Sequence, residues 1–228
     1  MKYDWILFDA DNTLFDFDKS ERYALQTTLS QFGLTFTQEN LDLYHAVNRR
    51  CWREMEEGKL SKEELRIRRF KLFFAGIKKE ADPQAVSDVY LKTLSQCSFL
   101  IEGAIPLLEA VRGQYKLGLV TNGLKEVQRP RIKKAQIGEY FEILVVSDEI
   151  GHAKPHAPFF DFAFSQMQNP PKNRVIMVGD SIHSDIQGGN NYGLDTCWYN
   201  YENRSNHLHI KPTFEITQLS QLHEVLNP

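Results

Sequence analysis

Side chains able to do acid–base and nucleophilic chemistry follow four short apolar segments of the sequence, soon after each segment ends. They are, in chain order, Asp9, Asp11, Thr121, Asn122, Lys154, Asp180 and Asp185. Two carboxylates separated by one residue, a hydroxyl group and a lysine are the groups with which proteins transfer phosphoryl groups. We therefore expect chemistry on a phosphate ester where the ends of these segments meet.

The paired carboxylates Asp9 and Asp11 suit two different tasks. Asp9 is the expected nucleophile, which would form an aspartyl-phosphate, and Asp11 would protonate the leaving alkoxide and afterwards activate water. Carboxylates repel a phosphate dianion, so the site also requires a cation. Asp9, Asp180 and a backbone carbonyl near Asp11 offer hard oxygen ligands suited to Mg²⁺, with Mn²⁺ as the other candidate.

The remaining residues of this set would act on the transferring group or support those that do. Lys154 would supply a fixed positive charge, and Thr121 a hydroxyl donor, to the phosphoryl oxygens. Asp185 is expected to orient Lys154 or metal-bound waters without itself contacting the metal or the substrate. Thr121 and Asn122 could instead cap the helix that follows them, which is compatible with catalysis because a helix N-terminus also binds phosphate.

The apolar segments themselves indicate how these side chains are brought together. They cover residues 5–8, 117–120, 143–146 and 175–178. Each is continuously apolar, which is typical of a strand buried on both faces of a parallel sheet. A fifth strand is expected at 196–199 and a weaker sixth at 213–216, with helical spacing between the strands. The pattern predicts a doubly wound α/β fold, whose ligands bind at the carboxyl ends of the strands.

One interval between strands is much too long for a single crossover helix. About 110 residues separate the first apolar segment from the second, and a structureless loop of that length is improbable. The sequence therefore predicts a helical domain at 16–95 inserted into a core formed by 1–15 and 96–228. Its helices are expected at 23–32, 38–57, 61–77 and 83–93, with Thr37 as a cap of the second and a Ser61–Glu64 capping box opening the third.

The composition of the sequence argues against several classes of protein. The 228 residues carry 27 basic and 30 acidic side chains, a formal charge of −3, which argues against a polyanion or anionic-membrane binder. The longest apolar runs fall far short of the roughly 20 residues that span a bilayer. The N-terminus lacks a secretory pattern, and the three widely spaced cysteines, Cys51, Cys97 and Cys197, indicate free thiols. We expect a cytoplasmic protein.

Four motifs in order identify a family. Asp9-x-Asp11-x-Thr13, Thr121-Asn122, Lys154-Pro155 and Gly179-Asp180-x-x-x-x-Asp185 resemble the haloacid dehalogenase (HAD) superfamily of phosphohydrolases. The resemblance implies a Rossmannoid core with a helical cap inserted after the first strand. Because Asp11 is present, dehalogenation is not expected, and no lysine of the predicted cap stands out as the Schiff-base lysine of a phosphonatase.

A narrower resemblance, to bacterial pyrimidine 5′-nucleotidases of this superfamily, concerns the substrate. It is carried by residues 1–15, Ala46-Val47-Asn48-x-x-x-Trp52, Arg69-Phe70 and Thr121-Asn122-Gly123. It implies nucleoside 5′-monophosphates such as dUMP and dTMP as substrates, with Asn48, Trp52, Arg69 and Asn122 contacting them. The expected partner is thus a small phosphorylated metabolite, neither a nucleic-acid polymer nor a membrane, while the oligomeric state stays open.

Two alternative functions compete with this one. Related members of the family act on sugar phosphates with the same catalytic groups. A non-enzymatic protein that binds phosphate or a partner is the other alternative, but such a protein has no need of Asp11.

Overall fold

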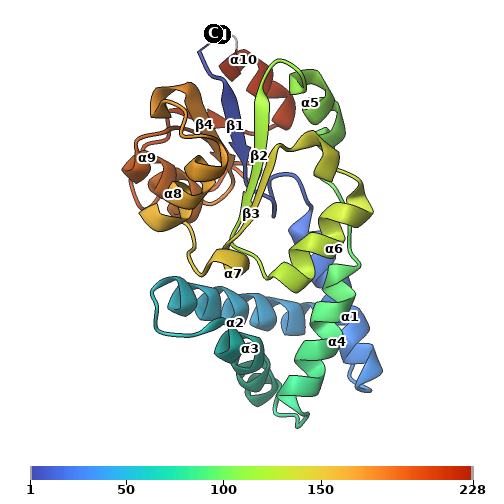
Figure 1. Ribbon diagram of the computed structural model, residues 1–228. Coiled ribbons are helices and arrows are strands. Elements are labelled where there is room, and N and C mark those ends of the chain that lie inside the picture. The colour runs from blue at the N-terminus through green and yellow to red at the C-terminus, as the bar shows by residue number, and fades with distance from the viewer. Residues whose placement is uncertain (1, 227–228) are drawn as a thin grey trace. The chain divides into compact units, whose positions relative to one another are not determined.

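Six strands form a single parallel sheet in the computed structural model, which describes residues 2–226 (Figure 1). The strands are β1 (Trp5–Phe8), β2 (Lys116–Thr121), β3 (Ile143–Val146), β4 (Val175–Gly179), β5 (Asp195–Tyr199) and β6 (Phe214–Ile216). Their order is β3-β2-β1-β4-β5-β6, with every neighbouring pair parallel. The predicted α/β sheet is confirmed, its short sixth strand included. The order reverses at β1, so β1 and β4 flank the switch point where such sheets bind ligands.

Helices and single helical turns connect these strands or follow the last of them. The helices are α5 (Ala104–Val111), α6 (Lys125–Ala135), α7 (Ser147–Ile150), α8 (Ala157–Gln166), α9 (Gly188–Tyr192) and α10 (Leu222–Leu226). Short 3₁₀ turns lie at Gly138–Tyr140, Lys172–Arg174 and Leu219–Gln221, and a π-helical segment occupies Ile182–Gln187.

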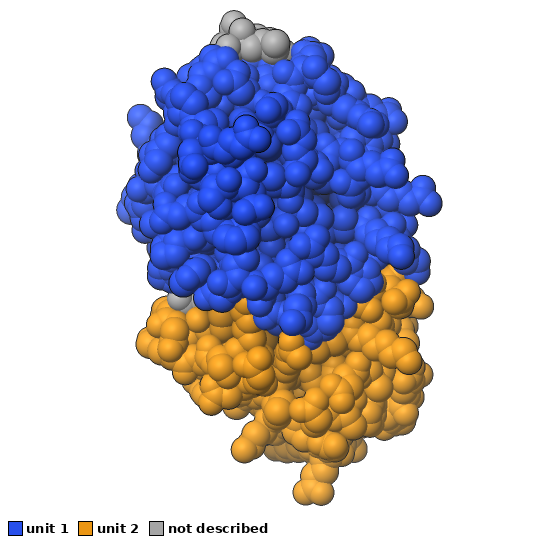
Figure 2. Space-filling model, in the orientation of Figure 1, with its two compact units in different colours: residues 1–17, 98–228 blue, residues 18–97 orange. Residues whose placement is uncertain are grey.

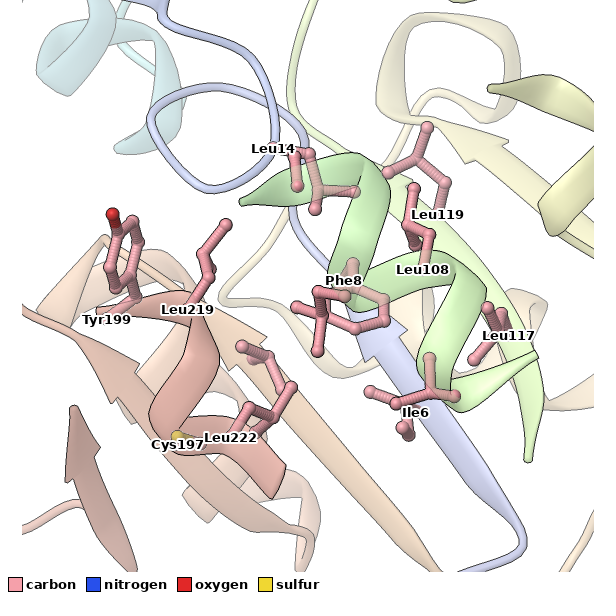
Figure 3. Packing of buried hydrophobic residues seen from close by; sticks show 14 of the residues in the cluster. Ile6, Phe8, Leu14, Leu108, Leu117, Leu119, Cys197, Tyr199, Leu219 and Leu222 are labelled. Carbon is pink, nitrogen blue, oxygen red and sulfur yellow. The ribbon is translucent and has the colours of Figure 1, made fainter. Parts of the chain in front are cut away.

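Hydrophobic clusters cover both faces of the sheet. Ile6 and Phe8 of β1 point into a cluster that includes Leu108 of α5 and Leu222 of α10 (Figure 3). The alternate residues of β1 point into a second cluster, which includes Phe159 of α8. Burial on both faces explains why the strands are continuously apolar rather than alternating.

The chain divides into two compact units, coloured separately in Figure 2. One contains the described residues up to Phe17 and from Ser98 onward, and the other is Asp18–Cys97. The second unit contains all but the first residue of α1 (Phe17–Gln31), together with α2 (Gln38–Glu56), α3 (Lys62–Ile77) and α4 (Pro83–Ser95). Thr37 caps α2 and Ser61 with Glu64 forms the predicted capping box of α3.

The first of these helices begins six residues before its predicted start. The backbone N–H of Phe17 donates to Asn12 Oδ1 at 3.0 Å, which satisfies a donor at the helix start. The buried face of α1 includes Ser20 and Glu21, and these polar residues before residue 23 interrupt the apolar period from which the start was predicted.

Two further features of the described residues bear on the class of protein. All three cysteines are buried and free, as the sequence predicted. Among the helices of residues 2–226, none combines the length and apolarity that crossing a bilayer demands.

Candidate active site

The first carboxylates lie on a tight turn that follows β1. The N–H of Asp9 donates to the Val178 carbonyl at 2.9 Å, so Asp9 extends the pairing of β1 with β4 by one residue. The N–H of Phe15 then returns to the Ala10 carbonyl at 2.8 Å and closes the turn. Asp11 therefore stands on a short loop whose backbone is fixed at both ends.

Lys154 lies at the centre of the site, and its ammonium group contacts three acceptors. Its Nζ donates to Asp9 Oδ1 at 2.6 Å, to Asp185 Oδ1 at 2.7 Å and to the Val120 carbonyl at 2.8 Å. The side chain is 1% exposed, so this charge is removed from water. A buried ammonium with three acceptors has its hydrogen-bonding capacity filled.

Asn122 holds the loop that carries Lys154. Its Nδ2 donates to the Lys154 carbonyl and its Oδ1 accepts from the Lys154 N–H, both at 2.8 Å. The alternative that Thr121 and Asn122 cap the following helix is wrong, because Leu124 occupies the N-cap of α6 and the first N–H of the helix, that of Lys125, donates to Asp148 Oδ2 at 3.1 Å. Thr121 Oγ1 instead accepts from the Gly123 N–H at 3.2 Å.

Three carboxylates form an acidic cluster beside this ammonium group. Asp9, Asp180 and Asp185 each place a carboxylate oxygen within 4.8 Å of the others. Asp185 comes from the π-helical segment after β4, where its Oδ2 also accepts from the Ser181 N–H at 3.0 Å. A Cβ at Gly179 would lie 2.2 Å from this Oδ2, so only glycine leaves room for the Asp185 carboxylate.

Burial and mutual repulsion alter the proton affinities of the cluster. Burial raises the pKa of Asp9 well above its ordinary value, against the opposing effect of Lys154. Burial, reinforced by Asp185, raises the pKa of Asp180 to about 7, with Arg204 opposing. Burial alone would lower the pKa of Lys154, but Asp185 and Asp9 outweigh it and the pKa is raised.

The donor set suits a hard divalent cation. Three carboxylates face Lys154 and Arg204, and Arg204 also pairs with Glu202, so at least one negative charge of the cluster is left uncompensated when all are ionised. Oxygen ligands alone are the environment that Mg²⁺ prefers. Asp9, Asp180 and Asp185 are therefore residues that could hold it.

Asp11 lies outside this three-carboxylate cluster and has partners of its own. Gln128 Nε2 donates to its Oδ2 and Arg131 Nη1 to its Oδ1, each at 2.6 Å. Because this carboxylate lies outside the cluster, a metal contact from Asp11 would come through the backbone carbonyl rather than the carboxylate. Gln128 and Arg131 were not predicted, although polar residues three apart on one face of a helix were a usable signal.

Asp180 also has a partner that the sequence did not indicate. Arg204, from the polar loop after β5, donates through Nη2 to the Asp180 carbonyl at 2.8 Å and to its Oδ2 at 3.2 Å. The indole N–H of Trp198 donates to the same carbonyl at 2.9 Å. Both the backbone and the carboxylate of Asp180 are thus held.

A family model of haloacid dehalogenase-like hydrolases matches residues 6–199, which contain the turn after β1, Lys154 and the acidic cluster. The chain belongs to the haloacid dehalogenase-like hydrolase family. It is an enzyme of this HAD family.

Full-length relatives support this membership. The chain is 38% identical over 226 residues to pyrimidine 5′-nucleotidase YjjG of Escherichia coli strain K12, with 99% of both chains covered. It is 35% identical over 228 residues to pyrimidine 5′-nucleotidase PynA of Streptococcus pneumoniae, covering 100% of this chain and 96% of PynA. The crystal structure of putative HAD-hydrolase YfnB of Bacillus subtilis, bound to magnesium, matches with a TM-score of 0.94 at 32% identity over 100% of both chains.

The three residues of the second unit that the nucleotidase resemblance singled out do not share one environment. Asn48 and Arg69 belong to a buried network, in which Asn48 Nδ2 donates to Glu21 Oε1 at 2.8 Å and Arg69 Nη1 to Asn48 Oδ1 at 3.4 Å. The Arg69 guanidinium also lies 4.8 Å from the centre of the Tyr90 ring. Trp52 is half-buried elsewhere, against a small cluster around Cys51. Glu21 was missed because a buried acid on a helix leaves no apolar pattern.

Proposed function

We propose that this HAD enzyme is a Mg²⁺-dependent phosphatase of nucleoside 5′-monophosphates with pyrimidine bases, and that it acts through an aspartyl-phosphate on Asp9. The observation that carries the proposal is the Asp9 carboxylate, which lies 2.6 Å from the buried Lys154 ammonium within an acidic cluster. The nucleotidase names of two full-length relatives support the substrate class.

In the first half of the proposed reaction, a carboxylate oxygen of Asp9 attacks the phosphorus and the ester P–O bond breaks. Asp11 gives its proton to the departing alkoxide oxygen, so that the nucleoside leaves as a neutral alcohol. Lys154 and the hydroxyl of Thr121 stabilise the charge on the transferring oxygens. The products of this half are the nucleoside and the acyl phosphate on Asp9.

In the second half, Asp11 takes a proton from a water molecule as that water attacks the phosphorus. The bond between phosphorus and the Asp9 oxygen breaks, which restores the Asp9 carboxylate and releases inorganic phosphate. Asp11 ends the cycle protonated, as it began, so the net reaction is hydrolysis of the ester.

Asp9, Asp180 and the backbone carbonyl at Asp11 would hold the cation, and Asp185 would fix Lys154 beside them. Bound there, Mg²⁺ supplies positive charge that lets a carboxylate and a phosphate dianion approach each other. The hard oxygen donors of the cluster fit this cation, and the related YfnB was crystallised with magnesium.

We further propose that Asn48, Trp52, Arg69 and Asn122 help select the substrate. Support for Arg69 is specific: its Nε and Nη2 atoms are buried and have no hydrogen-bond partner within the described residues. Buried donors without acceptors are costly, and a ligand that supplies acceptors would satisfy them. The nucleophilic role of Asp9 does not depend on this assignment.

The test is phosphate release with Mg²⁺ across a panel of nucleoside monophosphates and sugar phosphates. We expect kcat/KM to favour dUMP or dTMP by about tenfold or more, roughly 1.4 kcal/mol of transition-state binding. A profile led by a sugar phosphate would replace the nucleotidase assignment with the sugar-phosphate alternative. Absence of any phosphate release would refute the phosphatase assignment.

The nucleophile is tested by Asp9→Asn, with Asp4→Asn as the matched control. Asp4 precedes β1, and its side chain is half exposed and pairs with Arg174 at the surface. Asp9→Asn should abolish turnover and Asp4→Asn should leave it unchanged. A folded Asp9→Asn protein with wild-type turnover would overturn the mechanism.

A further inference from the structure

The carboxyl group of Asp11 is held from one side by two side chains of α6. Arg131 is 0% exposed and Gln128 is 1% exposed, whereas the Asp11 side chain is 26% exposed. The two donors therefore approach from the protein interior, while part of the carboxyl group stays open. Each of its oxygens accepts one donor and keeps a second lone-pair position.

Arg131 is itself fixed by the residues that follow the catalytic turn. Its guanidinium lies 4.6 Å from the centre of the Phe15 ring and 5.8 Å from that of Phe17. A guanidinium group stacked on aromatic faces keeps its N–H groups in a defined plane. Its direction toward Asp11 is thus set by packing as well as by charge.

Gln128 reaches Asp11 only because Gly123 has no side chain. A Cβ at Gly123 would lie 2.3 Å from Gln128 Nε2 and 2.6 Å from its Cγ. The backbone of Gly123 is not in the left-handed region, so this glycine is required by the close approach and not by its backbone angles. The glycine of the Thr121-Asn122-Gly123 motif thereby leaves the space that the Gln128 side chain occupies.

We propose that Gln128 and Arg131 are positioning residues for proton transfer, which hold the Asp11 carboxyl group in the orientation that serves the leaving oxygen. The inference rests on the proposed function, since it assumes that Asp11 is the acid. Neither positioning residue gains or loses a proton. The proton passes from Asp11 to the ester oxygen as the P–O bond breaks, and water later returns one to Asp11.

A simple structural role is the competing explanation, because a buried arginine requires a carboxylate partner in any case. The two explanations differ in how they treat leaving groups. A nucleoside alkoxide requires a proton to depart, whereas p-nitrophenolate departs as a stable anion without one. A misplaced Asp11 should therefore damage the first substrate class selectively, while a general loss of structure would damage both.

The experiment compares kcat/KM for dUMP and for p-nitrophenyl phosphate in the full-length protein with Mg²⁺. This parameter covers the steps through release of the leaving group. General acid catalysis contributes roughly 10²–10⁴-fold, so partial loss in Arg131→Met should lower the value for dUMP by about 10–100-fold. The value for p-nitrophenyl phosphate should fall by about threefold or less.

Three variants make the comparison specific. Arg129→Met changes the same residue type two positions earlier on α6, where Arg129 pairs with Glu149 at the surface, and should alter neither substrate. Arg131→Lys, which retains a charged donor, should restore part of the selectivity. Gln128→Leu should also lower kcat/KM more for dUMP than for p-nitrophenyl phosphate, by a smaller factor than Arg131→Met. If Arg131→Met does not fold, Gln128→Leu serves as the test variant.

Asp11→Asn completes the design as a double-mutant cycle. Residues that act as one unit give non-additive losses, so adding Arg131→Met to Asp11→Asn should lower kcat/KM for dUMP no further. Equal losses on both substrates, or additive losses in the cycle, would overturn the inference while leaving the phosphatase assignment intact. A wild-type protein that releases no phosphate from either substrate would overturn both.

Discussion

Replacing Lys154 with methionine should destabilise the unit that contains the sheet, because it removes the ammonium group and keeps the bulk of the side chain. Asp9 and Asp185 would then be buried carboxylates without a cationic partner, and the Val120 carbonyl would lose its donor. Removing one partner of a buried ion pair lowers the free energy of unfolding by about 3–5 kcal/mol. For a protein of this size, each kcal/mol lowers Tm by about 2–4 °C.

The assay is urea unfolding in EDTA at about pH 8, followed by tryptophan fluorescence in a Trp52→Phe background. The other two of the three tryptophans, Trp5 and Trp198, are buried in the unit that contains the sheet, so the signal reports that unit. The pKa of Lys154 is raised above its ordinary 10.5, so its stabilising contribution is complete below that value and is fully present at about pH 8. Denaturant midpoints then convert into free energies of unfolding.

Two further variants separate the electrostatic cause from a packing effect. Adding Asp185→Asn to Lys154→Met removes one uncompensated charge and should recover about half of the lost free energy of unfolding. Lys2→Met is the surface control, because Lys2 is 48% exposed in its pair with Asp195, and exposed pairs contribute only about 0–1 kcal/mol. The reasoning is refuted if Lys154→Met costs under about 1 kcal/mol, or if the double variant is no more stable than the single one.

Two other predictions concern the acidic cluster and the second unit. Gly179→Ala should cost about 1–3 kcal/mol in urea unfolding because its Cβ would displace the Asp185 carboxylate, whereas Gly138→Ala, whose Cβ would make ordinary contact, should be near neutral. A wild-type midpoint for Gly179→Ala would contradict this. The Glu21 carboxylate, whose Oε2 lies 3.0 Å from His45 Nε2, raises the pKa of His45 above 6.5, so the stability that this pair contributes is present below that pH and lost as pH rises through the raised pKa. The difference in Tm between wild type and His45→Gln should therefore be larger near pH 6 than near pH 9, and a constant difference would exclude the pair as its source.

The strands and the order of the motifs were predictable from local sequence. A run such as Trp5–Phe8 is apolar at every position because both of its faces are covered, and this pattern survives in the sequence alone. Parallel strands bring their carboxyl ends to one edge, so residues after each run had to meet there. The start of α1 was not predictable in this way, since the buried face of its first turns includes the polar residues Ser20 and Glu21.

The sequence by itself determined the sheet and the set of chemical groups at its edge, because both follow from periodicity and chain order. Only the tertiary structure decided which groups touch. Arg131 lies 120 residues from Asp11 along the chain, and Lys154 lies 145 residues from Asp9, yet each pair is 2.6 Å apart. Side-chain pairing over such separations is set by how helices pack on the sheet and by where a glycine leaves space. Local sequence propensity predicts neither the packing of the helices nor the space left by the glycine.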